Sequence, residues 1–259
     1  MITFSELGKW GHLGNQMYEY ATLLNIDLKL SYDIAVPPLG ARALASCFEI
    51  TAPILSDSDQ RQLRHVFHEP RLGYTERFWA IEDFTDLRSY FQSARYFPPQ
   101  DVLKSEFSFR ADLAEAATSF LEPLRDSGRV IVGMTVRRGD YQRNPDLFLQ
   151  LWDTDFCDRA LAEFENLDPI VVVSSDDYDW CRERFTGDRF VFTDTISIGA
   201  RLALLTRCDH LIVANSSFAW WAAWLNDGPG RRIAASRWWG EALEPQRDPL
   251  PEGWEALEV

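Results

Sequence analysis

The sequence is poor in the residues that mark a disulfide framework, a zinc site or a nucleic-acid surface. Its four cysteines are scattered without a Cys-x-x-Cys pair, which indicates reduced thiols and excludes a cysteine zinc site. Its four histidines include no His-Glu-x-x-His motif, which excludes a zinc protease of that type. Lysine occurs only at positions 9, 29 and 104 and the net charge is −14, which excludes a general nucleic-acid-binding protein.

Long apolar segments are also missing. No segment reaches the roughly 18 uncharged apolar residues that a membrane-spanning helix needs. The first residues carry neither the basic region nor the apolar run of a secretory signal. Together with the reduced thiols, these features predict a cytoplasmic protein.

The composition is that of a folded protein with room for one large core or two modest ones. The chain has 259 residues, of which 46% are hydrophobic and 25% charged. The polar segment 126–129 reads as a linker, so we predict an α/β domain over residues 1–126 and a second over residues 127–259. The second half repeats strand, polar tip and helix three times, which is typical of a doubly wound parallel sheet.

The stretch 130–141 dominates the second half. Val130, Ile131 and Val132 begin a buried strand, and Arg137 and Arg138 follow where the strand ends. Ligands bind at that end of an open α/β sheet, and a guanidinium fits a phosphate bidentately. Successive side chains of a strand point to opposite faces. We therefore expect one arginine to bind a phosphate and the other to pair with a carboxylate such as that of Asp140. A surface Arg-Arg turn paired to the same carboxylate is the alternative.

Two further strands end in polar residues. Residues 169–175 lead into Asp176 and Asp177, whose carboxylates suit a ribose or a base edge, although one of them is enough to cap the following helix. Residues 211–214 lead into Asn215-Ser-Ser at the start of a helix over 218–225, where free N–H groups form an anion site. The three strand ends together predict a site for a nucleotide diphosphate.

The first half contains a glycine-rich turn that leads into a helix. Glycines at positions 8, 11 and 14 precede Met17, Tyr20, Ala21 and Leu24, which are spaced as one apolar helix face. Asn15 either caps this helix or presents its amide to a substrate. Further along, residues 90–97 hold an aromatic patch, for which core packing and a sugar platform are both open.

Five motifs occur in one order along residues 8–225. They are Gly11-x-Leu13-Gly14-Asn15-Gln16-Met17, Tyr90-Phe91-Gln92-Ser93, Arg137-Arg138-Gly139-Asp140-Tyr141, Ser174-Ser175-Asp176-Asp177-x-x-Trp180 and Asn215-Ser216-Ser217-Phe218-x-Trp220-Trp221. In these motifs the chain resembles the α-1,2-fucosyltransferases, glycosyltransferase family 11. The resemblance implies a GT-B-like fold of two Rossmann-like halves around a central cleft, with the acceptor on the N-terminal side. It also implies GDP-fucose as donor, a galactoside-type acceptor, inversion at the anomeric carbon and no metal or other cofactor.

The resemblance also implies roles for single residues. Arg137 would hold the β-phosphate with support from Arg138 and Asp140, residues 215–218 would bind the diphosphate, and one of the two aspartates at 176–177 would contact guanosine. The implied donor-binding residues are Gly14, Arg137, Arg138, Asp140, Asp176, Asp177, Asn215, Ser216, Ser217 and Phe218. The catalytic candidates are Arg137, Asn15 and His12. The acceptor would be an oligosaccharide or a lipid-linked glycan, and a lipid-linked acceptor would place the protein at the inner face of the membrane, with peripheral association.

Two positions depart from the family pattern. Thr135 stands where the family has the histidine of His-x-Arg-Arg-x-Asp, which raises two alternatives: a transferase for another GDP-sugar, and a non-catalytic nucleotide-sugar or glycan-binding protein. His12 replaces the second of two paired glycines. Our hypothesis is that His12 positions or deprotonates the acceptor, and an exposed loop histidine without a role is the alternative.

Overall fold

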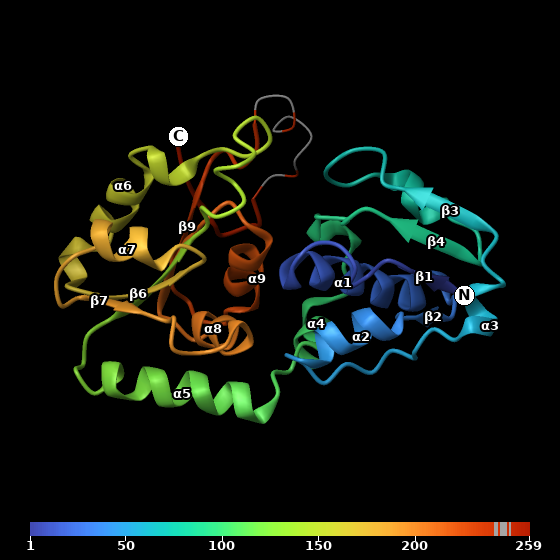
Figure 1. Cartoon of the computed structure of the whole chain (residues 1–259), viewed down its shortest axis with the longest axis horizontal. Coiled ribbons are helices and arrows are strands. Elements are labelled where there is room, and N and C mark those ends of the chain that lie inside the picture. The colour runs from blue at the N-terminus through green and yellow to red at the C-terminus, as the bar shows by residue number, and fades with distance from the viewer. Residues whose placement is uncertain (241–242, 244–247, 249) are drawn as a thin grey trace. The chain divides into compact units, whose positions relative to one another are not determined.

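The computed structural model describes residues 1–240, 243, 248 and 250–259. The chain divides into two compact units (Figure 1). Unit 1 comprises Met1–Arg110 with Gln246–Asp248, and unit 2 comprises Ala111–Pro245 with Pro249–Val259. Each unit is built on its own parallel sheet, which confirms the predicted α/β class.

Unit 1 has a four-stranded sheet in the order β2-β1-β4-β3, with every pair parallel. Its elements are β1 (Ile2–Thr3), α1 (Leu13–Leu30), β2 (Ile34–Ala35), α2 (Pro38–Ala45), α3 (Asp57–Gln60), β3 (His65–His68), the 3₁₀ helix η1 (Glu76–Ala80), β4 (Thr85–Arg88), the 3₁₀ helix η2 (Ala94–Tyr96) and α4 (Gln100–Glu106). Helix α1 is the predicted helix after the glycine-rich turn, and it buries Met17, Tyr20 and Ala21. Phe91 and Tyr96 lie fully in the aromatic core, so most of the aromatic patch at 90–97 is core rather than a sugar platform.

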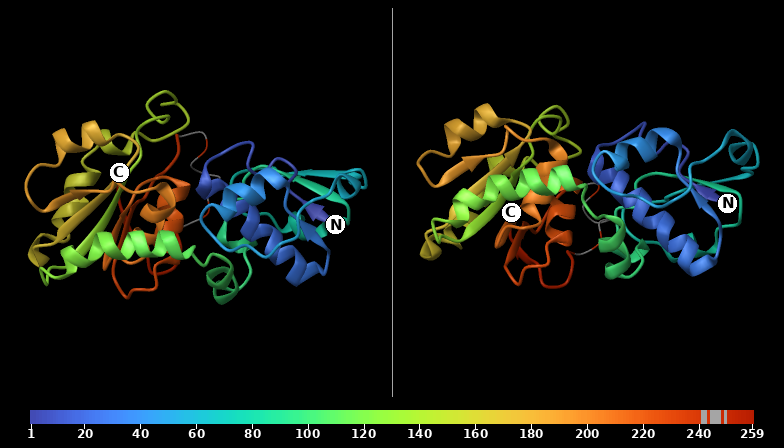
Figure 2. Two further views of the ribbon diagram at one scale, coloured as in Figure 1. Left: turned by 60° about the horizontal axis from the view of Figure 1, so that its bottom comes forward. Right: turned by 90° about the horizontal axis from the view of Figure 1, so that it is seen from below.

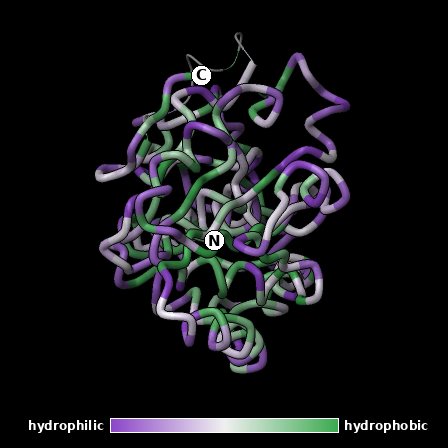
Figure 3. Tube along the Cα trace, turned by 90° about the vertical axis from the view of Figure 1, so that its left-hand side faces the viewer, coloured by the Kyte–Doolittle hydropathy of each residue, from purple (hydrophilic) through white to green (hydrophobic). Residues whose placement is uncertain are grey.

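Unit 2 has a six-stranded sheet in the order β10-β9-β8-β5-β6-β7, again with every pair parallel. Its elements are α5 (Ala111–Arg125), β5 (Ile131–Val136), η3 (Leu151–Asp153), α6 (Phe156–Ala162), η4 (Glu165–Leu167), β6 (Ile170–Ser175), α7 (Tyr178–Arg184), β7 (Phe190–Phe192), α8 (Ile198–Leu205), β8 (His210–Val213), α9 (Ser217–Leu225), β9 (Arg232–Ala235) and β10 (Glu255–Leu257). Helices α6 and α7 cover one face of the sheet, and α5, α8 and α9 cover the other (Figure 2). Every residue of β5 and β6 is buried, as a strand covered on both faces requires. Hydrophilic segments lie mainly in the outer loops (Figure 3).

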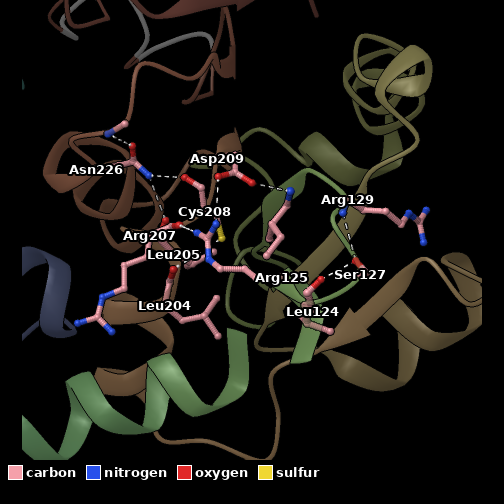
Figure 4. A network of polar contacts seen from close by, with 12 residues as sticks. Leu124, Arg125, Ser127, Arg129, Leu204, Leu205, Arg207, Cys208, Asp209 and Asn226 are labelled. Atoms are coloured by element: carbon pink, nitrogen blue, oxygen red, sulfur yellow. Dashed lines mark hydrogen bonds and ion pairs between the residues drawn. The ribbon is translucent and has the colours of Figure 1, made fainter. Parts of the chain in front are cut away.

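The units divide after Arg110, which differs from the predicted boundary between residues 126 and 127. The reason is α5, whose buried face of Leu113, Ala117 and Leu121 packs with α8 inside unit 2. Its last residue is bound there as well, because the Arg125 guanidinium donates to the carbonyl of Arg207 at 2.6 Å (Figure 4). The polar segment 126–129 is therefore a turn within unit 2.

Two further elements differ from the sequence-based expectation. The sequence pattern of residues 151–164 predicts one helix, but this segment forms η3 and α6. The break occurs because the Thr154 hydroxyl donates to the Leu151 carbonyl and accepts from the N–H of Phe156. The C-terminal residues are rich in Pro, Glu and Trp, which predicts a tail on the surface, but their end adds β10 to the sheet by parallel pairing with β9. Among the described residues, no helix is both long and apolar enough to cross a membrane.

One buried and one half-buried carboxyl group make the stability of unit 1 depend on pH. Burial raises the pKa of Glu19 and the pKa of Glu69 to about 8 each, from 4.5. Between pH 4.5 and about pH 8 the folded protein keeps these protons and the unfolded chain has lost them, so the unfolding free energy falls as pH rises.

Glu69→Gln removes one of these titrating groups. The unfolding free energy of this variant, relative to that of the wild type, should therefore increase as pH rises from about 5 to about 8. Urea unfolding at a series of pH values measures this difference. The same dependence of unfolding free energy on pH in the two proteins would contradict the prediction.

Candidate active site

The strand order of unit 2 defines where its sheet binds a ligand. From β5 the chain runs to β6 and β7 on one side, and then returns to β8 on the other side of β5. The connections after β5 and β8 therefore leave the sheet in opposite directions. Open α/β sheets bind ligands at such a switch point, outside the carboxyl ends of the strands. The residues after Val136 and Val213 are accordingly the ones at which we expect a ligand.

Arg137 is the first residue after β5, and its guanidinium lies between two carboxylates. It is 2.7 Å from Asp140 and 2.9 Å from Asp176, and its side chain is 24% exposed. Both contacts are ion pairs by distance, yet the buried Oδ1 of Asp140 accepts no hydrogen bond among the described residues. The carboxylates thus hold the guanidinium at the sheet edge while its N–H donors remain available to a phosphate.

Arg138 points into the protein and is only 8% exposed. Its guanidinium contacts Asp153 at 2.9 Å and Asp177 at 3.3 Å, and it stacks on the ring of Trp180 at 4.1 Å. Its backbone N–H donates to Asp176 at 2.9 Å. The two arginines therefore differ in environment, as the alternation along a strand predicts. Both pair with carboxylates, however, whereas only one was expected to do so.

Gly139 gives Asp176 its room between the two arginines. A Cβ at position 139 would lie 2.7 Å from a carboxyl oxygen of Asp176 and displace it. Asp176 is thus committed to Arg137 and to the backbone of Arg138, and Asp177 accepts the N–H of Trp180 as the cap of α7. The guanosine contact implied for one of these aspartates stays a prediction.

Two segments meet at the switch point: the residues after β5, described above, and the turn between β8 and α9. Asn215 is 3% exposed, and its amide donates to the carbonyls of Leu149 and Trp238. The Ser216 hydroxyl caps α9 by accepting the N–H of Ala219. In the described part of the chain the N–H groups of Ser217 and Phe218 have no acceptor, so they and the helix dipole offer positive potential to an anion. Asn215 thus positions this turn, and the helix end is the part that can bind.

Tyr141 links the residues after β5 to the turn between β8 and α9. Its hydroxyl donates to the carbonyl of Asn215 at 2.6 Å, and its ring stacks on Phe148 with a centroid distance of 4.0 Å. Burial raises the pKa of Tyr141, so the phenol stays protonated and remains a donor. Tyr141, Asp153 and Trp180 were not predicted as site residues. Tyr141 and Trp180 lie inside the sequence motifs, which was the only indication that they belong to the site. No sequence motif includes Asp153.

Removal of the Tyr141 hydroxyl should loosen this link. We expect Tyr141→Phe to lower the unfolding free energy by about 1–2 kcal/mol, because a buried hydrogen bond is lost and a carbonyl is left without a partner. Urea unfolding measures the change. Tyr32→Phe is the matched control, since the Tyr32 hydroxyl makes no hydrogen bond in the described part of the chain. Equal stability of Tyr141→Phe and the wild type would show that the link contributes nothing.

Thr135 does not face the switch point. It is 5% exposed on β5, where its hydroxyl donates to the Ile212 carbonyl and accepts the N–H of Ala214. The side chain therefore bridges β5 and β8 inside the sheet. The structure gives it a packing role, so its presence alone does not point to another donor.

The two N-terminal motifs come together within unit 1. The Gln92 amide donates to the Asn15 side-chain oxygen at 3.0 Å, and a Cβ on Gly11 would lie 2.9 Å from the ring of Tyr90. Gly11 also has a φ of +70°, so both its backbone and its surroundings require glycine.

Asn15 does not cap α1, which corrects one of its two predicted roles. The capping position belongs to His12, which is exposed and makes no side-chain cap bond. Gly14 is buried in the first turn of α1.

Metal ligands do not gather at these residues. Within the described ranges no group of three or more His, Cys, Asp or Glu side chains could hold a metal ion. The positive charge near the switch point comes from Arg137, Arg138 and the N-terminus of α9.

Comparison with known proteins decides the family. Residues 5–258 match the family Glycosyl transferase family 11. The chain belongs to this glycosyltransferase family.

Two relatives from Bos taurus illustrate the membership. The galactoside 2-alpha-L-fucosyltransferase SEC1 is 31% identical over 84% of this chain and 63% of its own length. The galactoside alpha-(1,2)-fucosyltransferase 2 is 32% identical over 84% of this chain and 67% of its own length. The chain thus spans about two thirds of the length of these relatives.

Solved structures share the fold of this family member at low sequence identity. The Bradyrhizobium α-1,6-fucosyltransferase NodZ, soaked with GDP-fucose, aligns with a TM-score of 0.54 and 16% identity over 86% of this chain and 91% of NodZ. A mutant of Arabidopsis thaliana FUT1 in complex with GDP aligns with a TM-score of 0.55 and 11% identity, over 89% of this chain and 69% of FUT1. These matches confirm the predicted GT-B-like fold of two parallel α/β units.

Proposed function

We propose that this chain is a galactoside α-1,2-fucosyltransferase that transfers fucose from GDP-fucose to a hydroxyl of a glycan. One observation carries the proposal: in a member of family 11, the half-buried guanidinium of Arg137 and the N-terminus of α9 flank the switch point of the unit 2 sheet. A guanidinium fork and free backbone N–H groups are the donors that a diphosphate requires. The relatives are named as fucosyltransferases of this specificity.

The mechanism follows from where charge develops. The acceptor hydroxyl attacks the anomeric carbon of fucose from the face opposite GDP, and the bond from that carbon to the β-phosphate oxygen breaks. The configuration inverts, the hydroxyl proton passes to a base, and negative charge grows on the departing phosphate. Arg137 and the N–H groups of Ser217 and Phe218 stabilise that charge. Because Asp140 and Asp176 lie beside Arg137, the helix end must supply much of the positive potential.

We further propose that donor binding needs no metal ion, because these groups are cationic or donate hydrogen bonds. The test is calorimetric titration of the full chain with GDP, UDP and GDP-fucose, first with EDTA and then with Mg²⁺, followed by transfer assays with GDP-fucose and GDP-mannose on methyl β-galactoside. GDP-selective binding in EDTA and transfer from GDP-fucose would support the proposal. A preference for UDP, strict metal dependence, transfer only from GDP-mannose, or binding without transfer to any galactoside would overturn it.

A further inference from the structure

Unit 1 has a hollow of about 570 Å³ at the carboxyl edge of its own sheet. The hollow lies where β1, β3 and β4 end, and the arrowheads of β3 and β4 point to the same edge (Figure 1). It is lined by residues that follow β1, by the end of β4 and by Glu19 of α1. Carboxyl ends of parallel strands are the usual ligand-binding edge of an α/β sheet. All of its lining residues belong to unit 1, and none of them is a residue described above at the switch point of unit 2.

Glu19 lines this hollow, and no residue in the described part of the chain is its hydrogen-bond partner. Its side chain is 6% exposed, and among the described residues it makes no hydrogen bond or ion pair; its Oε2 is buried and unpaired. A buried polar group without a partner is costly, and natural folds rarely leave one unless something else satisfies it. The last torsion of a glutamate is broad and two-fold, so either oxygen can be turned to an incoming group. A hydroxyl of a bound ligand would supply the missing partner.

The other side chains of the hollow fit a ligand without charge. Glu6 contacts Arg88 at 2.7 Å, and Arg88 also contacts Asp86 at 2.5 Å, so two carboxylates share one guanidinium and the remaining negative charge disfavours an anionic ligand. Burial, and next the charge of Glu6, raises the pKa of Glu19 to about 8, so this carboxyl is largely protonated at pH 7 and both donates and accepts. Such a group pairs with a neutral hydroxyl.

Trp10 gives the hollow an exposed apolar face. Its side chain is 64% exposed, the largest exposed fraction among the big hydrophobic residues of the described chain, and it lines the hollow. Tyr90 lines it as well and is half-buried. A flat aromatic ring beside hydrogen-bonding groups matches a ligand with one apolar face and a rim of hydroxyls. Among neutral ligands, a pyranose sugar has this pattern.

We propose that the hollow binds a neutral sugar residue of the acceptor, with the sugar ring against Trp10 and a sugar hydroxyl on the carboxyl group of Glu19. The name "acceptor" rests on the proposed function, whereas the sugar-binding role rests on the hollow alone. Neither Trp10 nor Glu19 was predicted as a site residue. Glu19 acts here as a hydrogen-bonding residue, and Trp10 as the platform.

The test compares variants of the full chain in the transfer assay. Trp10→Ala and Glu19→Leu should each raise the KM for methyl β-galactoside about tenfold or more, while the KM for GDP-fucose changes by less than about twofold. Glu19→Leu should not lower stability in urea, because an apolar side chain of similar size replaces an unpaired polar group. Glu19→Gln keeps a donor and an acceptor and should restore the KM. A loss of stability in Glu19→Leu with an unchanged galactoside KM would overturn the proposal.

A control and a second measurement separate this proposal from the proposed function. Glu69→Gln is the matched control, because Glu69 is a half-buried glutamate of unit 1 with one buried oxygen that has no partner among the described residues, but it does not line the hollow. Its galactoside KM should equal that of the wild type. Saturation-transfer NMR with methyl β-galactoside and no donor then reports binding alone. A signal that Trp10→Ala removes supports the sugar site even if no fucose is transferred. Normal transfer with an unchanged KM in both Trp10→Ala and Glu19→Leu would overturn the sugar site and leave the proposed function standing.

Discussion

Arg137→Ala should lower the rate of fucosyl transfer by about 100- to 1,000-fold or more, because one preorganised donor to the departing phosphate is lost. The two carboxylates beside it would then face the diphosphate without a cation between them, which adds to the loss. The fold should survive, since the side chains of Asp140 and Asp176 are 37% and 25% exposed and are hydrated when the arginine is gone. Steady-state kinetics with GDP-fucose and the midpoint of urea unfolding measure the two effects.

Two further variants make this result specific. Arg189→Ala is the matched control, because Arg189 immediately precedes β7 and so lies at the amino end of a strand in the same sheet, away from the switch point. It should keep full activity. Arg137→Lys keeps the charge but not the planar fork, and an intermediate rate is expected. Near-normal turnover in Arg137→Ala would remove the phosphate-binding role from this residue, and with it the mechanism proposed above.

Trp221→Ala should lower the unfolding free energy by about 3–5 kcal/mol, because a large aromatic side chain is removed from a fully buried position. Trp221 lies in α9, where its ring is 5.1 Å from that of Trp220 and 5.5 Å from that of Trp224. These rings hold the helix whose N-terminus carries Ser216 and Ser217. The affinity for GDP should therefore fall together with stability. Urea unfolding and calorimetry on the same samples measure both quantities.

Trp10→Ala is the control for the loss of a tryptophan as such. Its ring is 64% exposed, so the change in unfolding free energy should stay within about 0.5 kcal/mol, as for other surface substitutions. If Trp221→Ala were as stable as Trp10→Ala, then α9 would not depend on its aromatic packing. The position of its N-terminus would then have to be explained by the β8–α9 turn alone.

Local chemistry made much of unit 2 predictable. The apolar runs before Arg137, Asp176 and Asn215 correctly indicated β5, β6 and β8, because strands covered on both faces need uninterrupted apolar side chains. The polar residues after them mark the strand ends. A cap among Asn215-Ser-Ser was expected from the residue types before an apolar helix, and the structure assigns it to Ser216. Unit 1 was less predictable, since β1 and β2 have two residues each and a periodic pattern cannot show in so short a strand.

The sequence by itself determined the α/β class, the family and the residue types that can bind a diphosphate, because these depend on local periodicity and on motif order. The tertiary structure alone decided which partner each polar group has. Pairing between distant segments placed Asp153 on Arg138, Asp176 on Arg137 and the Thr135 hydroxyl inside the sheet. It also placed α5 in unit 2 and left Glu19 without a partner among the described residues, in a hollow that an exposed tryptophan also lines. Such contacts join residues far apart in the chain, and no local pattern encodes them.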